Sequence, residues 1–332
     1  MIKTIGYPRA ALVGNPSDGF NGRTIAFTFE NFSATAILKA QQTISILDCD
    51  QCWFHYESIE SLNAEIAQQN YTTSIALQQA TIRKFVEYCE NQKMSVQWHG
   101  FQLETHSDIP YQVGFAGSSA IIIAVLRALT QHYAVSIEPP VLASLALSVE
   151  TEELDIPGGL QDRVTQVYQG LVYMDFDNKY LAQQGYGYYR RLDTSNLPSL
   201  YIAWRQSIAE GSEVFHHDIR QRFNAGDQEI IKAVEDWRYL TNQFLAALEN
   251  RNVSVMHDVM NQNFDRRAQI YRISEGNREM IRIARECGAS AKFTGSGGAA
   301  IGIYHGEEMY QDLERRFSKK AISLFKPQIS NS

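Results

Sequence analysis

A glycine-rich segment that leads directly into an apolar helix limits the folds open to this chain. Residues 110–120 read PYQVGFAGSSA and run into the apolar stretch that follows them. Gly114 and Gly117 allow positive φ and a close approach of the backbone to a ligand, and the helix start offers free N–H groups that suit a triphosphate. Ser118 or Ser119 can cap the helix and present a hydroxyl to Mg²⁺. By itself the segment fits two interpretations equally well: a loop that binds phosphate, and a plain loop followed by a helix with a Ser N-cap.

Strand-like and helical segments are mixed along the rest of the chain. Runs of β-branched and aromatic residues predict strands, and apolar residues at helical spacing predict helices. The expected strands cover residues 24–29, 33–38, 96–103, 170–176, 199–204, 291–294 and 299–304. The expected helices cover residues 73–91, 118–133, 139–151, 227–250 and 253–287, the last with a break near Gly276. This mixture predicts an α+β fold with two sheet-based halves that meet between about residues 165 and 200.

The formal net charge of −7 argues against nucleic acid or an anionic membrane as a partner, because both bind basic surfaces. The densest apolar run, residues 120–126, is far shorter than the roughly 20 residues that span a bilayer. No signal-peptide pattern follows Met1, and four cysteines in 332 residues make no disulfide framework. We therefore expect a cytoplasmic protein. Cys49-x-x-Cys52 lacks the second pair of ligands that a zinc site needs, and His216-His217 is expected to be a solvated pair on a helix.

A second polar loop follows the short apolar segment that ends at Gly14. It presents Asn15, Ser17 and Asp18, which can hydrogen-bond a polyhydroxylated substrate. The alternative is an ordinary Asn-Pro and Asp-Gly turn. A Walker A loop is excluded because the chain contains no Gly-Lys pair, and no G-x-G-x-x-G opens a βαβ unit.

Two carboxylates and another glycine cluster complete the candidates. Glu150 closes an apolar helix and Asp162 follows a Pro-Gly-Gly turn, so both can be held rigidly, for Mg²⁺ or as a base. The alternative is a solvated helix end, which is the usual role of a charge run. Residues 292–298, KFTGSGG, predict a hairpin turn whatever their function.

The order and spacing of these segments resemble the GHMP kinase superfamily, which includes galactokinase, homoserine kinase, mevalonate kinase and phosphomevalonate kinase. Residues 110–120 match its second motif, with Phe115 where the motif has Leu and Ala116 where it has Gly. Residues 9–18 match the end of the first motif, and residues 292–298 match the third with one residue fewer. The resemblance implies an N-terminal ribosomal-S5-like β/α domain that binds ATP, over residues 1–170, and a C-terminal ferredoxin-like α/β-plait domain, over residues 171–332.

Glu150 and Asp162 keep the twelve-residue separation that the metal-binding Glu and the catalytic Asp have in galactokinases. The resemblance therefore implies ATP and Mg²⁺, with Mg²⁺ held by Glu150 and Ser118 (Ser119 as the alternate). Asp162 would accept the proton of the sugar's anomeric hydroxyl, and Arg9 would lie beside Asp162 and the γ-phosphate.

The other implied contacts involve two sets of residues. Those implied for the phosphates of ATP are Gly114, Phe115, Ala116, Gly117, Ser118, Ser119, Ala120, Gly295, Ser296 and Gly297. Those implied for the sugar are Asn15, Ser17, Asp18, Arg23 and Arg163.

Within the superfamily the nearest likeness is to glucuronokinases, which implies phosphorylation of D-glucuronate to its 1-phosphate. Asn15 after Gly14 and Arg163 after Asp162 depart from galactokinases and argue against galactose. Arg163 and Arg23 would suit a sugar acid, because a guanidinium can grip a carboxylate bidentately. Either arginine could equally pair with a structural Asp or Glu.

Three alternatives stay open. The chain could be another sugar-1-kinase of the superfamily, for fucose, arabinose, galactose or a heptose. A kinase of the mevalonate or homoserine type fits the residues 14–18 loop less well, and a non-catalytic sugar or ATP sensor would not need both the base and the metal ligand. The sequence leaves open the adenine pocket and whether the protein is a monomer or a homodimer.

Overall fold

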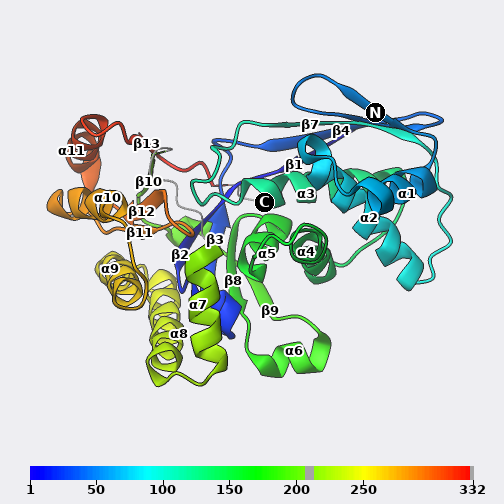
Figure 1. The fold of residues 1–332 in the computed structure, drawn as a ribbon. Helices are drawn as coiled ribbons and strands as arrows, with labels where there is room; N and C mark the ends of the chain where they lie inside the picture. The colour runs from blue at the N-terminus through cyan, green and yellow to red at the C-terminus, as the bar shows by residue number, and fades with distance from the viewer. Residues whose placement is uncertain (206–212, 330–332) are drawn as a thin grey trace. The chain divides into compact units, whose positions relative to one another are not determined.

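The computed structural model describes residues 1–205 and 213–329 (Figure 1). The chain divides into two compact units whose segments alternate along the sequence. Unit 1 comprises Met1–Pro8, Phe32–Ile109 and Gly117–Val167, and unit 2 comprises Arg9–Asn31, Pro110–Ala116 and Tyr168–Ser332. The last passage into unit 2 follows Val167, and the expected domain division after residue 170 stays a prediction.

Unit 1 is built on one sheet with strand order β1-β4-β7-β5-β6. Its strands are β1 (Ile2–Gly6), β4 (Ala34–Ala40), β5 (Ile44–Leu47), β6 (Trp53–Tyr56) and β7 (Phe101–Ser107). Its helices are α1 (Ile59–Gln69), α2 (Ala76–Asn91), α3 (Gly117–His132), α4 (Pro139–Ser148) and α5 (Leu160–Tyr168). The apolar helix α3 packs along β1 and β4 and buries Ile122, Ile123 and Val125 (Figure 1).

Unit 2 contains two further sheets, with strand orders β2-β3-β8-β9 and β11-β12-β10-β13. The first sheet is formed by β2 (Arg9–Val13), β3 (Arg23–Thr28), β8 (Leu171–Asp175) and β9 (Tyr188–Leu192). The second is formed by β10 (Leu200–Trp204), β11 (Lys292–Phe293), β12 (Ala299–Ile303) and β13 (Ser323–Phe325). The helices are α6 (Asn178–Gln184), α7 (Glu213–Asn224), α8 (Gln228–Glu249), α9 (Val253–Ile270), α10 (Glu275–Glu286) and α11 (Gly306–Ser318).

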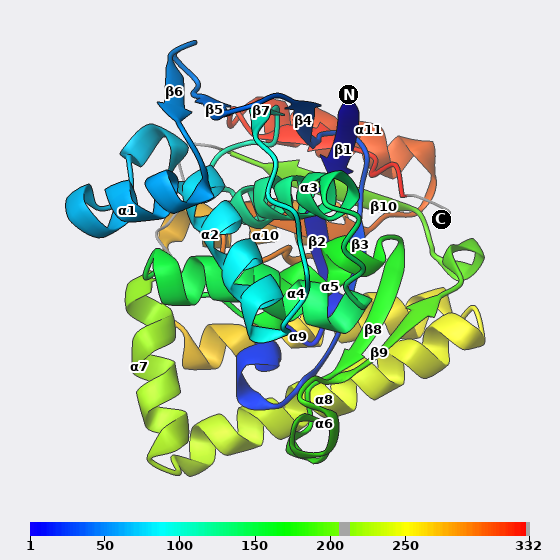
Figure 2. The same ribbon diagram turned by 90° about the vertical axis from the view of Figure 1, so that its right-hand side faces the viewer.

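Helices α8 and α9 lie side by side and both contact β2, so they cover the strand that begins at Arg9. Helix α6 lies at the tip of the β8–β9 hairpin (Figure 2). Helix α9 also contacts β11 and β12, which links it to the second sheet. Helix α9 therefore contacts strands of both sheets in unit 2.

The mixed α+β content that the sequence predicts is confirmed, and so are most of its elements. The strand expected over residues 96–103 is wrong at its start, because β7 begins at Phe101. Gly100 lies so close to the backbone of residues 42–43 that a Cβ there would come within 2.4 Å of Thr43 O. The break in the last long helix falls between α9 and α10, with Ser274 as N-cap, and Gly276 lies inside α10.

The sequence prediction missed several short or polar elements, among them β1, β5, β6, β9, β13, α1, α5, α6 and α11. His216 and His217 fall within α7, but their side chains lie outside the part that the structure describes. Among the described residues, no helix is long and apolar enough to cross a membrane.

Candidate functional site

In unit 2, Arg9 joins three segments that are far apart in the sequence. Its backbone N–H donates to Phe115 O at 3.1 Å, and its Nη1 donates to Gly114 O at 2.6 Å and to Thr294 O at 3.2 Å. Two residues along β2, Ala11 N–H donates to Thr294 O at 2.9 Å. The start of β2 thus holds the residues 110–116 loop and the β11–β12 turn together, with the guanidinium buried between them.

The two glycine-rich segments approach each other too closely for any side chain. A Cβ on Gly295 would lie 2.7 Å from Gly114 O and 2.9 Å from Arg9 Nη1. A Cβ on Gly114, which has a φ of +75°, would lie 2.9 Å from Gly297 O. Glycine is therefore required at both positions to bring these backbones around Arg9.

The other sequence-predicted residues of these segments play backbone or core roles. The Phe115 ring packs edge-on against Phe29 at 5.3 Å and contributes to the core. Ala116 has a φ of +59°, which turns the chain just before α3 begins at Gly117. Ser296 lies in the turn between β11 and β12, and its carbonyl accepts from Arg267 Nη2 at 2.8 Å.

The loop after β2 is held from α9. Asn263 Oδ1 accepts from Gly14 N–H at 2.6 Å, and its Nδ2 donates to Asn15 O at 3.0 Å. Asn15 is buried, and its Oδ1 has no hydrogen-bond partner within the described residues. Ser17 and Asp18 open the 3-10 helix Ser17–Phe20, where the Ser17 hydroxyl donates to Arg23 O at 3.2 Å.

Arg267 and Lys292 are positioning residues outside the set of site residues predicted from the sequence, where Lys292 was only the first residue of the predicted hairpin turn. Arg267 Nη1 donates to Gly295 O at 2.7 Å, one helical turn after Asn263 on α9. Lys292 Nζ donates to Ala11 O at 2.7 Å and to Phe293 O at 2.6 Å. Complete burial and the charges of Arg267 and Arg9 hold the pKa of the Lys292 amine well below its ordinary value.

In unit 1, a buried carboxylate lies between a hydroxyl and a guanidinium. Ser118 Oγ donates to Glu150 Oε1 at 2.7 Å, and Arg163 Nε donates to Glu150 Oε2 at 2.9 Å, with Nη2 on the same oxygen. Glu150 lies in a π-helical turn, Val149–Glu153, that continues α4. The neighbouring Ser119 hydroxyl instead donates to Gln166 Oε1 at 2.7 Å.

Asp162 and Arg163 share the first turn of α5. Asp162 Oδ2 lies 3.7 Å from Arg163 Nη1, and the Asp162 side chain is 21% exposed, whereas that of Glu150 is 1% exposed. Asp162 is therefore the more accessible of the two sequence-predicted carboxylates. Ala120 is buried in α3, where Gly6 approaches its carbonyl.

Arg23 lies opposite Asp175 in the β3–β8 register and forms an ion pair with it at 2.8 Å. Its Nη1 also donates to Asn242 Oδ1 at 3.1 Å. Burial lowers the pKa of the Arg23 guanidinium, but the nearby Asp175 carboxylate raises it, and the net result is a raised pKa. Both arginines suggested for a substrate carboxylate are thus paired with carboxylates of the chain itself.

The donor set at Ser118 and Glu150 fits Mg²⁺. Among the described residues, no group of three or more His, Cys, Asp or Glu could hold a metal ion. Mg²⁺ does not need such a cage, because it keeps several waters and uses one or two carboxylates together with substrate phosphates. A hydroxyl and a carboxylate oxygen 2.7 Å apart provide two oxygen ligands of the right kind.

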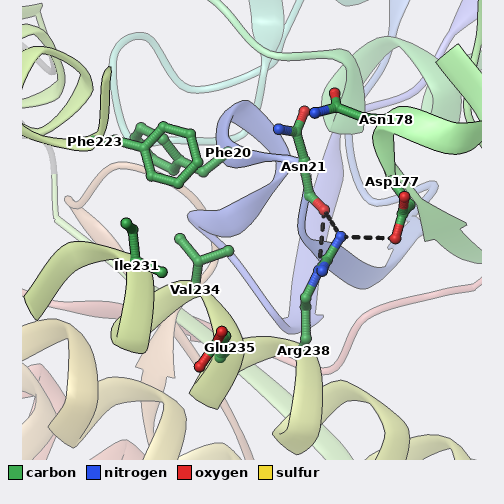
Figure 3. Close-up of a pocket in the computed structure, with 9 residues that line it drawn as sticks. All are labelled: Phe20, Asn21, Asp177, Asn178, Phe223, Ile231, Val234, Glu235 and Arg238. Carbon is green, nitrogen blue, oxygen red and sulfur yellow. Dashed lines mark hydrogen bonds and ion pairs between the residues drawn. The ribbon is translucent and has the colours of Figure 1, made fainter. Parts of the chain in front are cut away.

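A pocket in unit 2 is lined partly by Phe20 and Asn21, which follow Asp18 in the chain (Figure 3). Its residues are Phe20, Asn21, Asp177, Asn178, Phe223, Ile231, Val234, Glu235 and Arg238. Arg238 Nε donates to Asn21 O at 3.0 Å and Nη2 to Asp177 Oδ2 at 3.1 Å. None of the sequence-predicted site residues lines it, and its apolar side is closed by Phe20 against Phe223.

The chain is similar to known proteins along most of its length. The sequence model of the GHMP kinases N terminal domain matches residues 78–170, and that of the GHMP kinases C terminal domain matches residues 244–319. The chain is 34% identical to glucuronokinase 1 of Arabidopsis thaliana over 96% of this chain and 89% of the relative. It is 36% identical to probable glucuronokinase 2 of the same plant, over 89% and 82%. The structure of Methanococcus jannaschii mevalonate kinase superposes with a TM-score of 0.75 at 17% identity, over 99% and 98%.

Proposed function

Because the chain belongs to the GHMP kinase family, we propose that it is an ATP-dependent sugar-1-kinase whose substrate is D-glucuronate. The reaction forms a bond between the anomeric oxygen and the γ-phosphorus, breaks the bond from that phosphorus to the β-phosphate oxygen, and releases ADP. The observation that carries the proposal is the convergence of two glycine-rich backbones on the buried Arg9 guanidinium. The substrate assignment rests on the two glucuronokinase relatives.

Phosphoryl transfer depends on positioning and charge neutralisation more than on covalent chemistry. The start of α3 offers N–H groups and a positive dipole end for the α- and β-phosphates, which assigns that role to residues 114–120. The turn of Gly295, Ser296 and Gly297 would add backbone N–H groups near the transferring phosphate. Arg9 would stabilise charge on that phosphate in the transition state.

Mg²⁺, when bound, would neutralise charge on the phosphate oxygens. Ser118 and Glu150 would hold it, and Arg163 would keep the Glu150 carboxylate oriented through its ion pair. Asp162 would accept the proton of the anomeric hydroxyl, as general base or as orienting acceptor. Its carboxylate is partly exposed and lies 3.7 Å from Arg163 Nη1, which suits that task.

Asn15, Ser17 and Asp18 would bind the sugar. The unsatisfied, buried Asn15 Oδ1 supports this role, because a buried acceptor without a donor is costly and a sugar hydroxyl would supply one. A substrate role for Arg23 and Arg163 stays a prediction, and each guanidinium would have to exchange its present carboxylate partner for that of the substrate.

The test is ADP release measured against a panel of sugars with ATP and Mg²⁺. Glucuronate is expected to give the highest kcat/KM of the panel. Separately, we also propose a cytoplasmic location for the protein. Higher kcat/KM with fucose, arabinose, galactose or a heptose would place the chain in another branch of the sugar kinases. No release with any sugar, together with measurable sugar or ATP binding, would indicate a sensor.

A further inference from the structure

A sugar acid carries a carboxylate that a neutral sugar lacks, and an enzyme that prefers the acid must bind this negative charge. Buried or partly buried carboxylates are usually met by arginine, whose planar fork matches their geometry. The two arginines that the sequence suggests are already paired, Arg23 with Asp175 and Arg163 with Glu150. A different cationic side chain near the loop that carries Asn15 and Asp18 would therefore have to bind the carboxylate of the sugar.

Arg220, on α7, lies against that loop. A Cβ built on Gly19 would be 2.9 Å from Arg220 Nη2, so the guanidinium touches the backbone next to Asp18. Its Cζ lies 5.8 Å from the centroid of the Phe20 ring. Arg220 is exposed, and within the described residues no ion pair joins it to a carboxylate.

Aromatic packing fixes the place of this guanidinium. Phe223, one helical turn after Arg220, packs against Phe20 with ring centroids 5.2 Å apart and an interplanar angle of 57°. Figure 3 shows the two rings together on the apolar side of the pocket. The contact seats α7 against the 3-10 helix Ser17–Phe20, and Arg220 is thereby held beside Gly19.

Asp18 and Arg220 also act on the same buried side chain, Tyr271, through their charges. Burial raises the pKa of Tyr271 to about 12, and Arg267, Asp18 and Arg220 all act on it through their charges. The charges of Asp18 and Arg220 are therefore both close enough to the Tyr271 hydroxyl to act on it. A sugar that hydrogen-bonds Asp18 would have a guanidinium within reach of its far end.

We propose that Arg220 binds the carboxylate of the sugar acid and determines the preference for it over neutral sugars. The inference rests on the proposed function and names the group that distinguishes glucuronate at that site. Arg220 acts in binding, and it takes no part in proton or phosphoryl transfer. The variant without the guanidinium should consequently bind glucuronate weakly but turn it over at nearly the normal rate.

Steady-state ADP release from Arg220→Met, Arg220→Lys and Arg222→Met tests this. Arg222 is the matched control, because it lies two residues away on α7 and pairs with Asp227 and Glu229. Arg220→Met is expected to raise the KM for glucuronate at least tenfold, with kcat within threefold and the KM for ATP unchanged. Arg220→Lys is expected to restore part of the loss, and Arg222→Met to match the wild type.

A KM for glucuronate within twofold of the wild type in Arg220→Met would overturn the inference and leave the proposed function intact. An equal rise for Arg222→Met would overturn it too, because a general charge effect would then explain the result. Failure of the wild type to phosphorylate glucuronate would instead overturn the proposed function, and the carboxylate assignment with it.

Discussion

The hydroxyl of Ser118 donates to Oε1 of Glu150 at 2.7 Å, whereas the adjacent Ser119 hydroxyl is turned to Gln166. This relationship predicts different effects of the two alanine substitutions. Ser118→Ala removes one of the two proposed oxygen ligands and is expected to raise the Mg²⁺ concentration for half-maximal activity by about tenfold, the scale of a lost ligand-shell contact. Ser119→Ala should leave that concentration unchanged. Titration of ADP release with Mg²⁺ measures both, and identical curves would contradict the assignment.

Asp162→Asn keeps the size of the side chain but removes its basicity. If Asp162 accepts the sugar proton, kcat should fall by roughly 10²–10⁴-fold, while ATP binding stays near normal. Single-turnover kinetics at saturating ATP and glucuronate check the chemical step. Near-normal turnover would show that another group takes the proton.

Arg163→Ala would leave the buried Glu150 carboxylate without its guanidinium partner. Breaking one half of a buried pair costs about 3–5 kcal/mol, so the free energy of unfolding should fall by that amount. The matched control is Arg190→Ala, because Arg190 and Glu249 form an exposed pair, for which the loss should be below about 1 kcal/mol. Urea denaturation compares the two, and equal losses would mean that Glu150 is not held as described.

Gly295→Ala would push a methyl group into Gly114 O and Arg9 Nη1. Displacing these groups by even about 1 Å can reduce catalysis by roughly 10²-fold, so kcat should fall strongly. Gly185→Ala is the control, since Gly185 has a φ of +81° but nothing within 4 Å of a Cβ. It is expected to cost stability and leave kcat unchanged. A Gly295→Ala enzyme with full activity would contradict the close approach.

Lys292→Met should change how stability depends on pH. The folded pKa of Lys292 lies well below the ordinary value of 10.5, so between these two values the unfolded chain binds a proton that the folded chain does not. Stability then rises with pH in that window, by at most about 1.4 kcal/mol per unit. The variant lacks this contribution, so the wild-type advantage over Lys292→Met should grow from pH 7 to pH 10 in urea unfolding. A constant difference would mean that folding does not lower the pKa of Lys292.

Much of the site was predictable because its residue types are locally distinctive. Gly114, Ser118 and Gly295 lie in short segments where glycine and serine meet a helix or a turn, and such segments are recognisable without any knowledge of the fold. The tertiary supports were not predictable in this way. Asn263 holds Gly14 from 249 residues away, and in the sequence it is one polar residue in an amphipathic helix.

In the fold as well, some elements were predictable from the sequence and others were not. The long apolar helix α3 and the strand β8 were predicted because burial sets a strong periodic pattern. The strand β5 is four residues long, and α11 is rich in charged residues, so neither produces a pattern that stands above its neighbours. The ion pairs of Arg23 and Arg163 depend on strand register and helix placement, which composition does not encode.

The interleaving of the two units has a consequence for synthesis of the chain. All segments of unit 1 exist once residue 167 has been made, but the β2–β3 hairpin of unit 2 belongs beside β8. Thr28 and Gly170, which share a hydrogen bond, are 142 residues apart. At about 5–20 residues per second, that hairpin waits roughly 7–28 s on the ribosome for its neighbour. A nascent chain stopped at Val167 would present an open strand edge on β3, ready to pair with whatever strand it meets first.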